Sequence, residues 1–298
     1  MTIFSKRQVY HSLSLLFFII LVTACSSTRL IYSFTDKFIK DEINYFLYLD
    51  AEEKLLMNQQ VSEMINWHRT SMMPSYASYL DNIADTLEVG QYDANKITII
   101  IDEGRTLIED TIVGLTPYAS RFLIRIKNDE AIEFIKKQML MRQQERIIKL
   151  SEPREIRYKD RFDKLSKNFK RFFGNLTNAQ IEMLETHSHE TLNDARVRLH
   201  NRTLRQKAFV RFMKSQPNEA ELNAYLNKLL IRGHEIINPN YEDFSQASLS
   251  RFKILLIKML AISSDKQRNV MIDKLRSYAR EFLSVSYTHL RAHETTDN

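Results

Sequence analysis

The sequence predicts an all-α protein, on three observations. The 298 residues include only five glycines and five prolines, so the chain has few residues suited to turns. Apolar residues recur at helical spacing along most of the chain, and several of these stretches follow an N-capping residue. Because such apolar faces are buried only against one another, we expect an elongated array of antiparallel amphipathic helical hairpins. The array is expected as one domain or as two bundles that meet between Leu150 and Asn175.

The first helices are predicted from spacing and capping. Residues 30–49 carry aromatic and aliphatic side chains at helical intervals. Asp50 and Glu53 form a variant capping box, in which each side chain accepts a backbone N–H, and this begins a helix that runs to about Met72. Pro74 is expected to end or kink that helix, because it lacks a backbone donor.

The next segments are separated by glycine and proline. Residues 74–87 are expected to be helical up to a break at Gly90, and Asp93 caps the following helix. The β-branched run at residues 98–101 would also suit a strand, but isoleucines recur at helical spacing over four turns and favour a helix. Gly114 and Pro117 are expected to end this helix, with a short helix continuing to about residue 126.

The second half of the chain continues the pattern. Asn128 caps a helix over 129–150, and a helix over 153–172 carries a clear apolar stripe, formed by Tyr158, Phe162, Leu165, Phe169 and Phe172. Gly174 is expected to close that helix. Further capping boxes are predicted at Thr177 with Gln180 and at Ser264 with Gln267. Helices are also expected over 195–215 and 249–260 and up to Phe282.

The amino terminus is typical of an export signal. Lys6 and Arg7 precede an apolar run at residues 13–22, which ends in small residues just before Cys25. The run is shorter than the ~20 residues that a membrane-spanning helix needs. We therefore predict that residues 1–24 form a cleaved signal peptide.

Val22-Thr23-Ala24-Cys25 resembles the lipobox of bacterial lipoproteins, whose cysteine receives lipid before the signal is removed. This resemblance implies a lipid attachment at Cys25, the only cysteine of the chain. Several acyl chains would anchor the protein stably. Ser26 follows instead of Asp, which in such lipoproteins favours the outer membrane, with the chain facing the periplasm. A plain signal peptide followed by an incidental cysteine is the alternative.

The carboxyl terminus resembles translated sequencing-adapter DNA. Residues 285–295 read VSYTHLRAHET, and we interpret residues 285–298 as a cloning or assembly scar, with a native tail as the alternative. His289, His293 and Glu294 therefore carry no functional argument. Residues 25–284 are expected to form the helical periplasmic domain.

No residue spacing in the chain reaches the level of a catalytic motif. Trp67, His68 and Arg69 are adjacent, and His68 falls among apolar positions of its helix, which favours a buried, hydrogen-bonded histidine over a catalytic one. His187 and His189 point to different sides of a helix, so we expect no metal. Neither a phosphate-binding glycine loop nor a nucleophile elbow is present, so no cofactor and no enzymatic activity are expected. A cleft at His68 and Arg69 with a nearby carboxylate would favour an enzyme.

One stretch is strongly basic. Residues 195–215 contain no acidic residue, while an apolar stripe is preserved and seven cations are present, namely Arg196, Arg198, Arg202, Arg205, Lys207, Arg211 and Lys214. Export makes nucleic acid an improbable partner, so we expect this candidate binding surface to meet an envelope protein or an anionic envelope polymer or lipid. The alternative is a solvated face that neighbouring acids neutralise.

Several residues together resemble an uncharacterised family of Gram-negative lipoproteins with a domain of unknown function. They are Cys25, Tyr32, Leu49-Asp50, Trp67-His68-Arg69, Pro74, Tyr76-Ala77, Leu176-Thr177, Gln180 and Gln267-Arg268. The resemblance implies a location and a helical fold, and no activity.

The expected function is therefore a lipid-anchored, non-catalytic binding or scaffold protein of the envelope. A chaperone-like holdase is the alternative, because Leu176-Thr177-x-x-Gln180 is similar to a motif of small helical envelope-stress chaperones. A capping box explains those residues equally well. An enzyme with a site near His68 and Arg69 is the third and least favoured class.

Overall fold

A computed structural model describes residues 27–90, 92–126 and 128–287, with side chains from Phe34 to Ser286 within these ranges. The described chain is helical and contains no strand, which confirms the all-α prediction. The predicted signal peptide, Cys25 and residues 288–298 lie outside the described residues. The elements are α2 (Ser27–Phe46), α3 (Ala51–Trp67), the π-helical turn η1 (His68–Met72), α4 (Met73–Val89), α5 (Ala94–Leu123), α6 (Asp129–Leu150), α7 (Arg154–Phe173), α8 (Asn178–Glu190), α9 (Asp194–Lys214), α10 (Glu219–Ile231), α11 (His234–Ile237), α12 (Tyr241–Ala261) and α13 (Asp265–Tyr287).

The predicted capping boxes are confirmed. At α3, the Glu53 N–H donates to Asp50 Oδ1 over 2.8 Å, and the Asp50 N–H donates to Glu53 Oε2 over 2.9 Å. Equivalent pairs open α8 at Thr177 with Gln180 and α13 at Ser264 with Gln267. These contacts satisfy backbone donors that the first turn of a helix leaves free.

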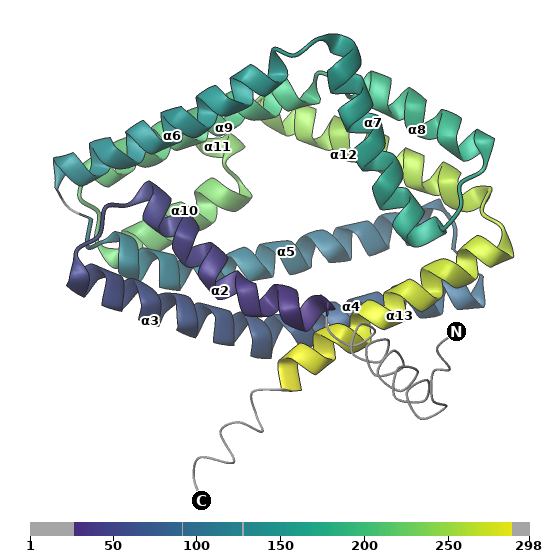
Figure 1. Cartoon of the computed structure of the whole chain (residues 1–298), viewed down its shortest axis with the longest axis horizontal. Coiled ribbons are helices and arrows are strands. Elements are labelled where there is room, and N and C mark those ends of the chain that lie inside the picture. Colours follow the sequence, from purple (N-terminus) through teal and green to yellow (C-terminus); the bar gives the residue numbers. More distant parts are fainter. Residues whose placement is uncertain (1–26, 91, 127, 288–298) are drawn as a thin grey trace, which may run out of the picture.

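Pro74 does not end its helix. The Met73 N–H donates to His68 O, a bond of the π type, and α4 continues directly from η1. The wider turn precedes the position where Pro74 lacks a donor, so the chain passes the proline without breaking. α3, η1 and α4 thus follow one another as a long helical rod along the base of Figure 1.

The predicted break at Gly114 and Pro117 is wrong, since α5 runs unbroken from Ala94 to Leu123. Pro117 cannot donate to Val113 O. Thr116 Oγ1 lies 3.1 Å from that oxygen and 2.9 Å from Asn227 Oδ1 of α10, so its one proton is shared between the two acceptors. Gly114 lies where the Trp67 ring covers the helix, so its lack of a side chain is used in packing. A neighbouring hydroxyl and a tertiary contact therefore offset the two helix-breaking residues.

The broadest pairings join helices that are far apart in the sequence. α4 and α13 lie antiparallel, with Arg276 Nη2 2.8 Å from Asp85 Oδ1 and with Tyr76 against Phe282 further along. α5 pairs with α10, and α6 with α9. The expected pairing of consecutive helices holds for α7 with α8 and for α2 with α3, so an array of local hairpins does not describe the whole arrangement.

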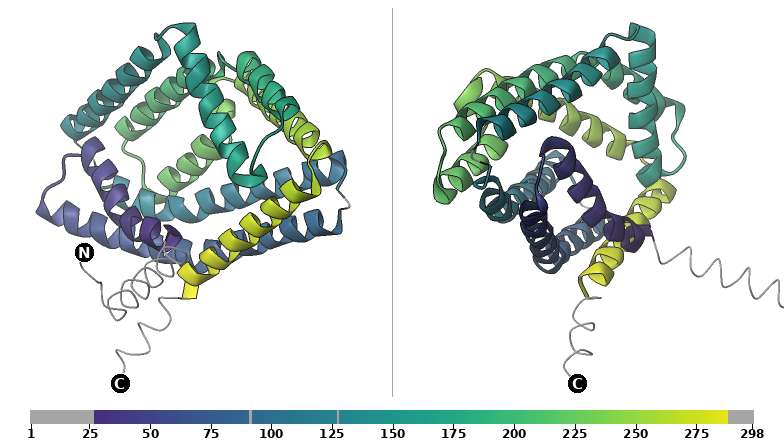
Figure 2. Two further views of the ribbon diagram at one scale, coloured as in Figure 1. Left: turned by 45° about the vertical axis from the view of Figure 1, so that its right-hand side comes forward. Right: turned by 60° about the vertical axis from the view of Figure 1, so that its left-hand side comes forward.

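The helices form a three-sided frame (Figures 1 and 2). α6 and α9 run along one side, α8 and α12 along a second, and α3, α4, α5 and α13 form the base. α7 descends from the corner at which the first two sides meet, which is the top of Figure 1. In the described part of the chain, no helix combines the length and hydropathy needed to cross a bilayer.

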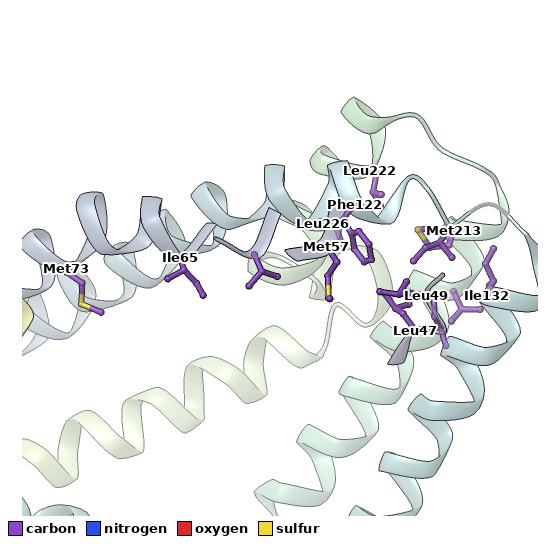
Figure 3. Close-up of a cluster of buried hydrophobic side chains, with 14 of the residues drawn as sticks. Leu47, Leu49, Met57, Ile65, Met73, Phe122, Ile132, Met213, Leu222 and Leu226 are labelled. Carbon is purple, nitrogen blue, oxygen red and sulfur yellow. The ribbon is translucent and has the colours of Figure 1, made fainter. Parts of the chain in front are cut away.

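Two hydrophobic cores stabilise the frame. The first gathers Met57, Phe122, Ile132, Met213 and Leu222 where α3, α5, α6, α9 and α10 meet (Figure 3). The second contains Ala84, Phe169, Leu184, Met259 and Leu275. Each core draws on both halves of the sequence, so a division between Leu150 and Asn175 does not separate two bundles.

The last helix passes the predicted boundary at Ser284. α13 continues to Tyr287, and Val285 is only 3% exposed within the first core. The origin of the residues beyond this helix stays a prediction.

Candidate functional site

The cations of the predicted basic surface do not form one free face. Arg196 and Lys214 point to α6: Arg196 donates to Leu150 O over 3.0 Å, and Lys214 Nζ lies 2.6 Å from Glu133 Oε1. The seven cations of α9 therefore do not share one face, and their role in binding stays a prediction. Residues 196 and 214 are five helical turns apart and share one side of α9, whereas Arg198 and Arg202 lie on another.

Lys214 belongs to an exposed ion-pair network. Hydrogen bonds from Lys214 and then Lys136 lower the pKa of Glu133 to about 2, and the hydrogen bond with Glu133 raises the pKa of Lys214. This part of the surface is thus neutralised by an acid of the neighbouring helix. Lys207 and Arg211 lie nearby, in the wall of a groove of about 250 Å³ between α6 and α9.

Arg205 is half-buried beside the turn that precedes α11. Its Cδ and Nε lie 3.4 Å from where a side chain on Gly233 would begin, and burial lowers the pKa of its guanidinium. Arg205 therefore positions the turn before α11, and we do not place it in a binding surface.

Arg198 and Arg202 line a pocket of about 540 Å³, which is larger than three other pockets found in the described chain. It lies at the upper corner of Figure 1, where the end of α6 and the beginnings of α7 and α9 meet, and we name it the α6–α7–α9 pocket. Its lining has seven cations, two carboxylates, an amide and five apolar side chains: Arg146, Lys149, Arg157, Arg161, Lys164, Arg198, Arg202; Glu152, Asp160; Asn168; Leu150, Leu165, Leu192, Ala195 and Leu199.

Hydrogen bonds hold the wall where α7 meets the α8–α9 turn. Arg161 Nε donates to Thr191 Oγ1 over 2.7 Å, and the Thr191 hydroxyl donates to His187 O over 2.5 Å. Thr191 and His187 are both buried. Burial lowers the pKa of Arg161, and the neighbouring Arg198 and Arg251 act in the same direction. Arg161 is thus fixed in place by its partners on the adjoining helix.

Asp194 is a buried acid at the first residue of α9. It lies 3.0 Å from Arg251 Nη2 and 3.4 Å from Arg198 Nη2, and Ser248 donates to it over 3.3 Å. These contacts bind the beginning of α9 to α12. The negative charge that offsets Arg198 and Arg251 is therefore located behind the pocket, in the fold itself.

Several cations of the pocket have no acidic partner among the described residues. Arg146, Lys164 and Arg202 form no ion pair within the described residues, although each comes from a different helix. Burial lowers the pKa of Arg202, and Arg146, Arg205 and Arg142 lower it further. Arg157 donates to Glu152 O over 3.2 Å, while its Nη1 is buried and has no partner among the described residues. The pocket thus concentrates positive charge that the described residues leave uncompensated.

The Trp67-His68-Arg69 cluster lies at the junction of α3 and η1. The Tyr76 hydroxyl is 3.4 Å from His68 Nε2 and also contacts Thr111 on α5. Burial lowers the pKa of His68. Neither His68 nor Arg69 lines any of the four pockets described here. The cluster joins the rod to α5 and α13, because Tyr76 also packs against Phe282.

The two histidines of α8 are separated, as their spacing predicts. His187 is buried, whereas the His189 ring stacks on Tyr158 with centroids 3.9 Å apart. Across residues 27–90, 92–126 and 128–287, no group of three or more His, Cys, Asp or Glu side chains is arranged to hold a metal ion.

Sequence reasoning missed most of the pocket. Arg157, Arg161 and Lys164 stand at i, i+4 and i+7, which places them on one side of α7, and this spacing was available as a signal. Arg146 and Lys149 on α6 could be assigned to the same site only through the tertiary packing.

The fold and the site together define an all-helical protein with a cationic, apolar-lined pocket where three helices meet. A family model described as "Family of unknown function (DUF6279)" matches residues 45–242, and the chain belongs to this family. This match confirms the expectation of an uncharacterised family, and residues 45–242 include the whole pocket lining. No curated protein and no solved structure matches the chain.

Proposed function

We propose that the protein is a lipid-anchored, non-catalytic binding protein of the cell envelope. It is attached through Cys25 to the outer membrane, faces the periplasm, and binds an anionic envelope component in the α6–α7–α9 pocket. The lipobox-like sequence supports the anchor, and the pocket supports the binding role.

The observation that carries the binding role is the charge imbalance of the pocket. Seven cations face two carboxylates, and five of the cations have no ion pair in the described chain. Three of these five, Arg146, Lys164 and Arg202, also form no side-chain hydrogen bond there, whereas Arg157 and Arg161 do. Cations held close together repel one another, and the half-buried Arg157 and Arg161 also carry a desolvation cost. A bound anion would relieve both effects, so the site is suited to attract and retain negative charge.

Affinity capture after crosslinking in intact cells tests this role. The pocket variant carries Arg146→Gln, Lys164→Gln and Arg202→Gln, and a control variant carries Lys167→Gln, Lys170→Gln and Arg171→Gln, which removes as much charge from exposed positions of α7 outside the pocket. Wild type and control should retain the same anionic component, and the pocket variant should lose it. Equal recovery by all three proteins would contradict the proposal.

The anchor is tested separately by Cys25→Ser. Metabolic labelling with a fatty acid should mark the wild type and leave the variant unlabelled, and the variant should accumulate as precursor or as soluble periplasmic protein. Normal acylation of the variant would remove the lipoprotein assignment without affecting the pocket.

A holdase is the second candidate, and one observation favours it. Leu140, Met141 and Ile148 of α6 are 52%, 48% and 62% exposed, which gives this helix apolar side chains accessible to a client. Recovery of many unfolded envelope proteins by wild type, pocket variant and control alike would favour this function over the pocket-based one.

A further inference from the structure

We propose that the α6–α7–α9 pocket takes a phosphate ester that carries an apolar group, as in the head region of an anionic amphiphile. This inference rests on the proposed binding function and specifies the ligand class for the same site. It follows from three properties of the pocket: the directions from which its cations come, its apolar lining, and its size.

The free cations come from three directions. Arg146 lies near the end of α6, Lys164 on α7 and Arg202 on α9, so each wall of the pocket supplies a cation that forms no ion pair in the described chain. A planar carboxylate is satisfied by one guanidinium fork. A phosphate presents oxygens in several directions and can accept from several cations at once, so cations on three walls fit it better.

Arg157 and Arg161 complete the cationic wall on α7. Arg161 is held by Thr191, and Arg157 by the carbonyl of Glu152. Arg157 Nη1 remains a buried donor without a partner in the described chain. Because these side chains are already fixed, their donors are held in place before any ligand arrives, which limits the entropy cost of binding.

The apolar lining excludes a purely hydrophilic anion as the best fit. Leu150, Leu165, Leu192 and Leu199 line the same pocket as the cations. Inorganic phosphate would satisfy the charges and leave the half-buried Leu150, Leu165 and Leu199 in contact with water. A ligand with an apolar group attached to the phosphate would bury them as well, with a gain proportional to the apolar area removed from water.

The size of the pocket agrees with such a ligand. Its volume of about 540 Å³ lies within the ~300–1,000 Å³ typical of small-molecule sites. Asp160 lies 3.8 Å from Lys149 and thereby neutralises a cation other than the three free ones, and Glu152 forms no ion pair with any of the three within the described residues. The site therefore has room and charge for a head group together with part of an apolar tail.

Calorimetric titration of the full chain in a nonionic detergent tests the inference. The probes are dihexanoyl phosphatidic acid, glycerol 3-phosphate with the same head and no chains, inorganic phosphate, and hexanoate. Dihexanoyl phosphatidic acid should bind most tightly, glycerol 3-phosphate more weakly, and hexanoate least. The variant with Arg146→Gln, Lys164→Gln and Arg202→Gln should lose about tenfold or more in affinity for the phosphatidic acid, because charged hydrogen bonds are lost.

Two further variants distinguish the contribution of the phosphate head to the affinity from that of the apolar chains. Leu199→Ala should lower the affinity for dihexanoyl phosphatidic acid several-fold and leave the affinity for glycerol 3-phosphate unchanged. The Lys167→Gln, Lys170→Gln and Arg171→Gln control should bind all probes as the wild type does. Circular dichroism checks that each variant is folded.

The titration can reject the phosphate-ester ligand without rejecting the anion-binding function of the pocket. Equal affinity for glycerol 3-phosphate and phosphatidic acid would show that the ligand needs no apolar group. The site would then bind a hydrophilic phosphate and not the head region of an amphiphile. Tighter binding of hexanoate than of either phosphate ester would show that the pocket does not recognise a phosphate group. Binding of poly-L-glutamate through the same three cations, with no response to any phosphate probe, would overturn the ligand class and leave the anion-binding function in place.

Discussion

The indole ring of Trp67 lies directly on the backbone of Gly114. A side-chain carbon on Gly114 would stand 1.9 Å from both Cζ2 and Cη2 of Trp67, a distance that no packed structure permits. The contact joins the long rod of α3, η1 and α4 to α5. Tyr79 makes a second contact of this kind, since its hydroxyl would be 2.5 Å from a side chain on Gly104. Two aromatic rings of the rod thus pack against two glycines of α5.

Gly114→Ala should destabilise the protein, although alanine usually stabilises a helix interior by ~1 kcal/mol over glycine. The added methyl group forces the Trp67 ring out of its position, and overpacking of this kind costs ~1–3 kcal/mol. Urea unfolding followed by circular dichroism measures the change.

The double variant isolates the cause. In a Trp67→Ala background the methyl group meets no ring, so Gly114→Ala should become neutral or stabilising there. An equal loss of stability in both backgrounds would show that the Trp67 contact is not the reason.

Acid should weaken the fold near neutrality. Burial lowers the pKa of His68 and of His187 below the ordinary value of 6.5, so the unfolded chain binds more protons than the folded one in the range just below that value. The free energy of unfolding should therefore fall as the pH drops through about 6.5. It should be insensitive to these histidines above that range.

Substitution of the two histidines tests this dependence. His68→Gln and His187→Gln should each reduce the fall in unfolding free energy between pH 7.5 and pH 5.5, as measured by urea titrations. His200→Gln is the matched control at an exposed position. An unchanged pH dependence in both buried-site variants would contradict the assignment.

Asp194→Asn should be costly because the side chain is buried. The variant removes the negative charge that Arg198 and Arg251 share, and it leaves these cations beside Arg161 without compensation. We expect a loss of ~1–3 kcal/mol in unfolding free energy. Asp102→Asn, which breaks an exposed pair with Lys253, should cost less than ~1 kcal/mol. Similar losses in the two variants would show that burial of Asp194 does not matter.

Shortening the chain after Tyr287 and after Ser284 should give different results. The first cut leaves α13 complete, and the unfolding transition should stay where it is. The second removes Val285 from the first core, at a cost of ~1–3 kcal/mol. Equal thermal midpoints for the two truncated chains would show that Val285 contributes nothing, as the predicted scar boundary at Ser284 requires.

Local features of the sequence were sufficient to predict the helices. The capping boxes at Asp50, Thr177 and Ser264 were predicted because a capping residue and its partner lie three positions apart and form their bonds within one turn. The aromatic stripe of α7 was predicted because spacing along a helix fixes which side chains share a face, and Phe169 is buried as that stripe requires.

Tertiary structure decided what these helices do together. Gly114 and Pro117 predicted a break in the helix, because local propensity does not show that the Trp67 ring of another helix packs on Gly114. The sequence predicted that the seven cations of α9 form a binding surface. In the structure, Glu133 of α6 neutralises Lys214, and Arg205 packs against Gly233. Only the packing of α6, α7 and α9 brings Arg146, Lys164 and Arg202 around one pocket, because the charge that surrounds a side chain depends on helices far away in the sequence.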